Sequence, residues 1–218
     1  MLKRIVVCWV IALVAACATS KPNLPAESDG LRLMPDTKLA TVYMKPGADL
    51  SQYDKIALLD TYVAFAKNWE RNYNEEATFE DRVSDKDMQE IRQRVASEFN
   101  REMTKVLTKD GREMVSKGGT GVLILRPAII NLRVTAPDLM TAGMEQTFVA
   151  SAGSMTLFME LLDGKTGALI AKVIDTEAAD SGGMMQVADS VTNMADFDRV
   201  VRRWAGILNS HLAKITTK

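Results

Sequence analysis

Apolar residues recur at steps of three and four residues in two long stretches of the chain, which is the spacing of an amphipathic helix. The first stretch follows Ser84, whose hydroxyl suits a helix N-cap with the carboxylates of the next turn. The second follows the cap candidates Asn193 and Asp196. Each pattern predicts a long helix with its apolar stripe in the core. The stripes are Met88, Ile91, Val95, Phe99 and Met103, and then Phe197, Val200, Val201, Trp204, Ile207, Leu208, Leu212 and Ile215.

Five other stretches have the composition of strands, and a short sixth is a candidate at 113–115. The last two alternate apolar and polar residues and flank a turn with two glycines, which is typical of a hairpin. Together the patterns predict an α+β domain with a mixed, mainly antiparallel sheet of five or six strands and the two long helices packed on one face. The five stretches are residues 39–44, 54–63, 122–134, 154–162 and 168–177.

Three local features refine this picture. Pro127 interrupts the long strand, so we expect a bulge or an edge there. The glycines of 117–121 are followed by a strand and not by a helix, which favours a turn over a phosphate cradle. Residues 67–83 mix charges with aromatics and are expected to form a long loop packed by Trp69, Tyr73 and Phe79, with a ligand-stacking loop as the alternative.

The N-terminus follows a different pattern. Ile5–Ala16 is an apolar run of twelve residues after two basic ones, too short for a bilayer core that needs about 20. Small residues precede Cys17, and this resembles the lipobox of bacterial lipoproteins, in which that cysteine carries the acyl chains. The alternative is ordinary cleavage after Ala16. Ala18 stands where an aspartate commonly signals inner-membrane retention in proteins resembling this one, so we expect an outer membrane lipoprotein facing the periplasm.

The expected organisation has three parts. Residues 1–16 are a cleaved signal peptide, and residues 17–38, rich in proline and polar residues, are the lipidated Cys17 and a flexible tether. Residues 39–218 are a single α+β periplasmic domain. Cleavage leaves one cysteine, so no intramolecular disulfide is expected. It also leaves 25 basic residues against 28 acidic ones, a balance that predicts no nucleic-acid partner.

Three groups of residues resemble the bacterial lipoproteins of the domain-of-unknown-function family 3313. They are Tyr43–Ile56, Arg126–Ile129, and the turn Leu162–Gly167 with Asp175 beyond it. The resemblance extends from about Leu39 to the C-terminus. It implies a secreted, lipidated α+β domain and brings no catalytic residues with it.

The residues offer weak catalytic candidates. Asp180-Ser181-Gly182-Gly183 is similar to the nucleophile region of trypsin-like proteases, but Ala179 replaces a glycine there and His211 follows the serine instead of preceding it. We therefore expect a loop at Ser181 and a partly packed helix histidine at His211. Asp175 and Glu177 share one strand face and could serve acid–base work or a hard cation, although a solvated face is the alternative we favour.

The sequence therefore predicts a non-catalytic binding or structural lipoprotein of the cell envelope, without cofactor or metal. Its expected partners are the membrane, through the acyl chains on Cys17, and an envelope protein. Four methionines are candidates for an adaptable contact surface, namely Met140, Met144, Met184 and Met185. The alternative is a periplasmic ligand carrier or hydrolase with a site formed by loops 135–152 and 178–193. A closed apolar cavity favours a carrier, converging polar groups an enzyme, and a flat methionine-rich patch a protein partner.

Overall fold

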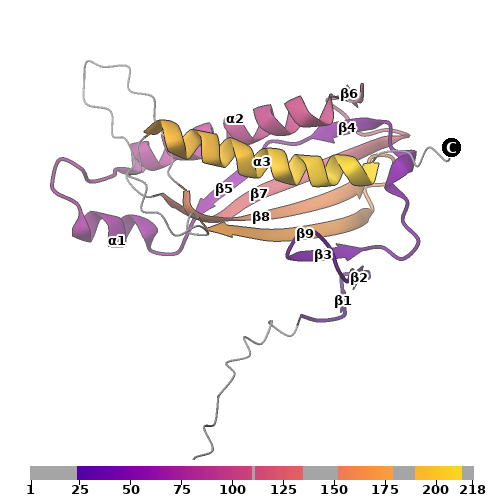
Figure 1. Ribbon diagram of the computed structural model, residues 1–218, viewed down its shortest axis with the longest axis horizontal. Helices are drawn as coiled ribbons and strands as arrows, with labels where there is room; N and C mark the ends of the chain where they lie inside the picture. Colours follow the sequence, from indigo (N-terminus) through magenta and orange to yellow (C-terminus); the bar gives the residue numbers. More distant parts are fainter. Residues whose placement is uncertain (1–23, 110, 135–151, 179–189, 213–218) are drawn as a thin grey trace, which may run out of the picture.

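A mixed sheet of nine strands carries two long helices on one face (Figure 1). The computed structural model describes residues 24–109, 111–134, 152–178 and 190–212. The predicted α+β class is confirmed, but the sheet has nine strands instead of five or six, and a third helix is present. The elements are β1 (Glu27–Ser28), β2 (Leu31–Leu33), β3 (Thr41–Met44), η1 (Leu50–Gln52), β4 (Lys55–Leu58), β5 (Tyr62–Phe65), α1 (Trp69–Glu76), α2 (Asp85–Leu107), β6 (Glu113–Met114), β7 (Val122–Val134), β8 (Ala152–Asp163), β9 (Leu169–Ala178) and α3 (Ser190–Leu212).

The strands follow the order β1-β2-β3-β9-β8-β7-β4-β6, and β5 also pairs with β7. Pairing is antiparallel from β1 across to β7, and parallel where β4 meets β6 and β7 and where β5 meets β7. The predicted hairpin is confirmed as β8 and β9. The candidate strand at 113–115 is confirmed as β6. Two strands beyond the predicted number, β1 and β2, are two or three residues long. A period of two leaves no visible signal over so few residues.

Pro127 explains a second difference. The stretch predicted as one strand at 54–63 is two strands along one edge of β7, with Leu58 paired to Leu125 and Tyr62 paired to Ala128. Pro127 lies opposite the gap between them, and it has no N–H to offer a partner strand. A register shift toward β8 also occurs after Ile130. The predicted interruption is therefore a break in the neighbouring strands, while β7 itself runs on.

The two long helices are confirmed, with one difference at their start. At α2, Ser84 Oγ accepts from the Asp87 N–H at 3.3 Å and Asp87 Oδ2 accepts from the Ser84 N–H at 2.8 Å, a reciprocal capping box. At α3, the helix begins at Ser190. The cap candidates Asn193 and Asp196 are thus inside the helix, because the apolar stripe marks where a helix packs and not where it starts.

The sheet reaches further toward the N-terminus than the sequence predicts. Residues 17–38 were expected to be a tether, but β2 pairs with β3 through Arg32 and Met44, and Leu31 is 2% exposed. The Tyr43 hydroxyl donates to the Pro25 carbonyl at 3.0 Å on the same side. The folded domain therefore includes Glu27, and any tether ends before it.

The segment 67–83 was expected to be a loop and instead contains α1. Trp69 stacks between Phe65 and Tyr73, with ring centroids 4.7 and 5.4 Å apart, and its Nε1 donates to the Val134 carbonyl at 3.3 Å. These contacts confirm the expected aromatic packing for Trp69 and Tyr73. Phe79 is 86% exposed, so its predicted packing is wrong.

In the part of the chain that the structure describes, no helix is both long and apolar enough to cross a membrane.

Candidate functional site

A difference in width between the sheet and its helical cover creates the main site. Two helices side by side cover about 20 Å. The eight strands that follow one another in the sheet order, without β5, span about 34 Å at a spacing of about 4.8 Å. In Figure 1, α2 lies toward β4 and β6, and α3 runs beside it, with its last turns lining a pocket together with β8 and β9. Of the helices that the structure describes, none therefore lies above the inner face of β3, which is left beside α3.

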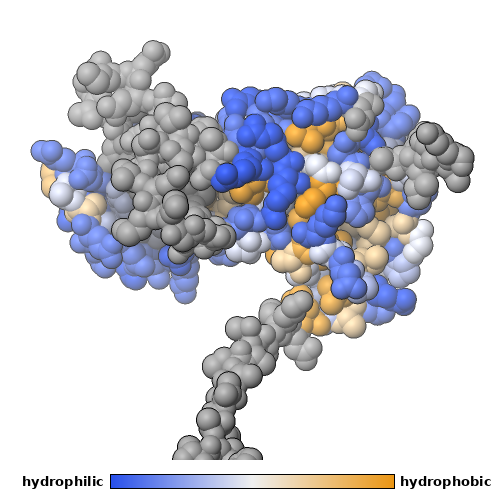
Figure 2. All heavy atoms as spheres, viewed as in Figure 1, coloured by the Kyte–Doolittle hydropathy of each residue, from blue (hydrophilic) through white to orange (hydrophobic). Residues whose placement is uncertain are grey.

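An apolar pocket of about 180 Å³ lies at this place. Its floor is formed by alternate residues of β3, β8 and β9, its roof by the last turns of α3, and its side by residues 34–39 and Leu50. Figure 2 shows hydrophobic residues on the surface between α3 and the strands β1–β3. The lining residues are Met34, Thr37, Lys38, Leu39, Val42, Met44, Leu50, Leu157, Met159, Leu161, Ala171, Val173, Trp204, Ile207, Leu208 and His211.

A buried carboxylate positions the indole in this roof. Asp175 is 5% exposed; its Oδ2 accepts from Trp204 Nε1 and from Arg203, both at 2.7 Å, and its Oδ1 accepts from the Ala40 N–H at 2.7 Å. Glu177 also pairs with Arg203. The predicted pair of Asp175 and Glu177 is therefore on one strand face, as expected. The expectation of a solvated face is wrong for Asp175, which ties α3 to β9 and to residue 40.

The mouth of the pocket carries two basic side chains. Lys38 and His211 are exposed, although both contribute to the lining. His211 Nδ1 donates to the Ile207 carbonyl at 2.8 Å, which leaves Nε2 as the free ring nitrogen. The pocket is thus apolar inside and basic at its edge, and its lining includes no carboxylate.

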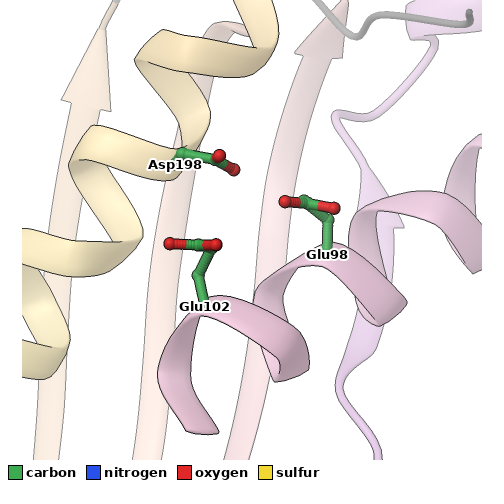
Figure 3. A group of neighbouring side chains, drawn as sticks. All are labelled: Glu98, Glu102 and Asp198. Atoms are coloured by element: carbon green, nitrogen blue, oxygen red, sulfur yellow. The ribbon is translucent and has the colours of Figure 1, made fainter. Parts of the chain in front are cut away.

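A second group of side chains lies on the other flank of α3. Glu98 and Glu102 of α2 point toward Asp198 of α3 (Figure 3), and each of the three offers an oxygen within 4.8 Å of the others. Glu102 is 1% exposed at its side chain. Such a set of oxygens is what a hard cation takes.

Basic side chains already occupy the surroundings of this carboxylate cluster. Arg101 pairs with Glu98, and it lies 3.5 Å from Glu102 and 3.7 Å from Asp198. Arg202 lies 3.3 Å from Glu102 and 3.9 Å from Asp198, and Lys105 lies 3.5 Å from Glu102. With three cations facing three carboxylates, we interpret the cluster as an ion-pair contact between α2 and α3.

One carboxyl of the cluster has a strongly changed affinity for protons. Burial and then the neighbouring Asp198 raise the pKa of Glu98 to about 7, while Arg101 opposes the shift. Among the described residues, Asp198 Oδ1 is buried and has no hydrogen-bond partner. A protonated Glu98 would supply the donor that this oxygen lacks.

Two of the groups that carry the family resemblance, Tyr43–Ile56 and the turn Leu162–Gly167, are joined by a hydrogen bond. The Tyr53 hydroxyl donates to Asp163 Oδ2 at 3.0 Å, and burial together with this carboxylate raises the pKa of Tyr53 to about 12. A Cβ at Gly118 would lie 2.5 Å from the Gly164 carbonyl oxygen, so the two turns approach too closely for any larger residue. These contacts explain the motifs as fold chemistry, and they confirm the turn expected at 117–121.

Several predicted site residues lie outside the described residues. They include Cys17, Ser181 and the four candidate contact methionines Met140, Met144, Met184 and Met185, as well as most of the loops 135–152 and 178–193. His211 is described, at the end of α3 and exposed, so it is less packed than the sequence predicts.

The pocket and its methionines Met34, Met44 and Met159 have no clear signal in the sequence. A signal for part of it was present, because Val42 and Met44 share one face of a strand by their spacing of two. The other face of β3 carries Thr41 and Tyr43, both of which are buried. Nothing in the sequence says that the cover over the face of Val42 and Met44 is incomplete.

The family model for proteins of unknown function named DUF3313 matches residues 27–208. The PelC dodecamer from Paraburkholderia phytofirmans is 13% identical, with a TM-score of 0.36, over 74% of this chain and 96% of that chain. A candidate lipoprotein from Caulobacter crescentus CB15 is 15% identical, with a TM-score of 0.28, over 75% of this chain and 88% of that one. A DUF4136 family protein from Bacteroides thetaiotaomicron is 9% identical, with a TM-score of 0.36, over 85% and 99%. At these TM-scores the likeness supports no conclusion about this chain. No curated protein matches it.

Proposed function

The chain belongs to the DUF3313 family of proteins of unknown function, and from its apolar pocket we propose that it is a non-catalytic binding lipoprotein of the cell envelope. The observation that carries the proposal is the composition of the pocket. Apolar side chains form its floor and roof, and its polar members Thr37, Lys38 and His211 lie in the segment 34–39 or at the end of α3. A site of this kind binds an apolar group, whereas acid–base chemistry requires polar groups that converge on one point.

The place of this binding is the membrane-proximal periplasm in our proposal. Cys17 carries the acyl chains, and Ala18 favours the outer membrane over the inner one. Two or three chains at about 0.8 kcal/mol per buried methylene hold a protein on the bilayer. The methionines Met140, Met144, Met184 and Met185 remain our candidates for contact with an envelope protein.

A neutral apolar dye tests the pocket. The chain from residue 17 onward with Cys17→Ser retains every described residue, all of which follow residue 23, and it lacks the thiol that would be acylated. We expect the emission of N-phenyl-1-naphthylamine to rise on saturable 1:1 binding, with its phenyl ring inside the pocket and its naphthyl ring at the mouth. Val42→Phe, which adds a ring inside the pocket, should abolish the rise. Ile174→Phe, on the opposite face of the neighbouring strand β9, is the matched control and should keep it. Dye binding that survives Val42→Phe would place the apolar site elsewhere.

A fractionation experiment tests the anchor. Cys17→Ser in the full precursor should prevent lipid labelling and leave uncleaved or misplaced protein, because no thiol remains to acylate. Unchanged labelling and unchanged membrane association of the serine variant would contradict the lipobox.

A further inference from the structure

We propose that the pocket binds a single-chain fatty-acid-like carboxylate, with the alkyl tail between Met44 and Trp204 and the head group beside Lys38 and His211. This inference rests on the proposed binding function and names the class of ligand. Three observations carry it: the volume of the pocket, its apolar lining and the charge at its mouth.

The volume limits the size of the apolar part. A dry engineered cavity of about 150 Å³ accommodates benzene, with six carbons. The pocket of about 180 Å³ would therefore hold about six to eight carbons of a chain. That is one alkyl chain, with any remainder extending through the mouth. A lipid with two full chains does not fit.

The lining suits a flexible tail. Met34, Met44 and Met159 all contribute to the walls. Unbranched thioether side chains adapt their shape to the occupant, so they can follow the different conformations of an alkyl chain. The indole of Trp204 is fixed by its hydrogen bond to Asp175 and gives the tail one rigid surface.

The charge at the mouth selects an anionic head group. Lys38 is exposed and forms no hydrogen bond or ion pair with the residues that the structure describes, so its ammonium is available to a ligand. His211 comes from a different element, the end of α3, and its Nε2 donates to a carboxylate when both ring nitrogens carry a proton. Asp36 is two residues from Lys38 but is not part of the lining, and Asp175 is already bound by Arg203 and Trp204. The mouth therefore attracts a carboxylate and repels an ammonium.

Trp204 provides the readout. The chain from residue 17 onward with Cys17→Ser has two tryptophans, Trp69 and Trp204. Trp69→Phe then leaves Trp204, which lines the pocket, as the single tryptophan. The probes are dodecanoate, dodecan-1-ol and dodecyltrimethylammonium, each below its micelle concentration. We expect a saturable change in Trp204 emission, and at least about tenfold tighter binding of dodecanoate than of the ammonium probe.

Charge reversal at the mouth separates the head group from the tail. Lys38→Glu should weaken dodecanoate at least about fivefold and leave dodecan-1-ol within about twofold. Lys67→Glu is the matched control, an exposed lysine outside the lining with the same change in net charge, and it should change neither affinity. His211→Gln should weaken dodecanoate about two- to threefold.

The possible failures are distinct. Equal affinity for the three probes, or an equal effect of Lys38→Glu and Lys67→Glu, overturns the anionic ligand and leaves the apolar binding function standing. If neither these probes nor the neutral naphthylamine dye binds, the binding function fails together with the ligand class.

Discussion

The two flanks of α3 are built from different chemistry. Toward α2, the helix presents Asp198 and Arg202 to Glu102, in a contact made of buried and half-buried charges. Toward β3, it presents Trp204 and Leu208 over an apolar hollow. One flank is therefore filled and paired, and the other is left partly empty.

This difference indicates what each flank contributes. The free energy of removing charged groups from water offsets most of the attraction between them, so a buried ion-pair cluster adds little net stability. Loss of one partner is nevertheless destabilising, because it leaves the other charge buried and unpaired. The charged flank thus fixes the place of α3 against α2. An apolar hollow forgoes packing energy in the folded state. A ligand that fills it would recover that energy, which is why we assign binding to this flank.

The largest expected effect comes from the residue that belongs to both the core and the pocket. Trp204 is 2% exposed, and Trp204→Ala removes its ring and its hydrogen bond to Asp175. We expect a loss of about 3–5 kcal/mol in the free energy of unfolding, measured by denaturant titration. A loss below 1 kcal/mol would contradict the packing of α3 on the sheet.

Trp204→Phe is the matched variant, because it keeps an aromatic ring in place but removes the N–H donor together with part of the indole volume. Asp175 still accepts from Arg203 and Ala40. The expected loss is about 1–3 kcal/mol, the cost of leaving a buried acceptor short of one partner.

The charged flank gives the next largest effect, and it depends on pH. The pKa of Glu98 is raised from its ordinary 4.5 to about 7, so the folded protein binds more protons than the unfolded chain between these values. The free energy of unfolding therefore falls as pH rises from about 4.5 to about 7 and stays lowered above that. Glu98→Gln should remove this dependence and stabilise the protein at pH 8 by about 1–2 kcal/mol, less than the full shift implies because solvent screens part of it.

Denaturant titrations at pH 4.5 and pH 8 measure this effect. Glu80→Gln is the control, because Glu80 is an exposed carboxylate outside the cluster. It should leave the difference between the two pH values unchanged. If the free energy of unfolding instead rose from pH 4.5 to pH 8, and Glu98→Gln removed that rise, folding would lower the pKa of Glu98. That outcome would contradict proton sharing with Asp198.

The hollow flank should tolerate truncation better than the filled core. Leu208→Ala enlarges a pocket that exists already, so we expect a loss of about 1 kcal/mol. Leu107→Ala is the matched variant in α2, where the leucine is fully buried, and there a new cavity should cost about 2–5 kcal/mol. If Leu208→Ala and Leu107→Ala lowered the stability equally in thermal melts, the pocket would be closed in solution.

The sequence predicted those elements in which a regular spacing of apolar residues continues over many residues. The stripes around Phe99 and Trp204 and the hairpin at 163–167 extend over enough residues to show their spacing. The short strands β1 and β2 do not, and they depend on partners elsewhere in the sheet. The helix α1, which begins at Trp69, was not predicted for a similar reason, because it is eight residues long and mostly polar.

The candidate site was less accessible to sequence reasoning. The pocket depends on how much of the sheet α3 covers, a distance between elements that no local pattern records. The carboxylate cluster had a partial signal, because Glu98 and Glu102 are four apart and so share one face of α2. The approach of Asp198 from α3, ninety-six residues after Glu102, could not be read from that spacing.

The smallest expected effect is at His211. This residue ends α3, is exposed, and donates Nδ1 to a carbonyl of its own helix. His211→Ala should change the free energy of unfolding by less than about 0.5 kcal/mol, as is usual for an exposed site. The same variant tests the proposed absence of catalysis, with Ser181→Ala as its companion. Both variants should retain the cellular phenotype of the parent at equal protein level. Loss of that phenotype in both, with unchanged melting temperatures, would replace the binding function with one that uses a serine and a histidine.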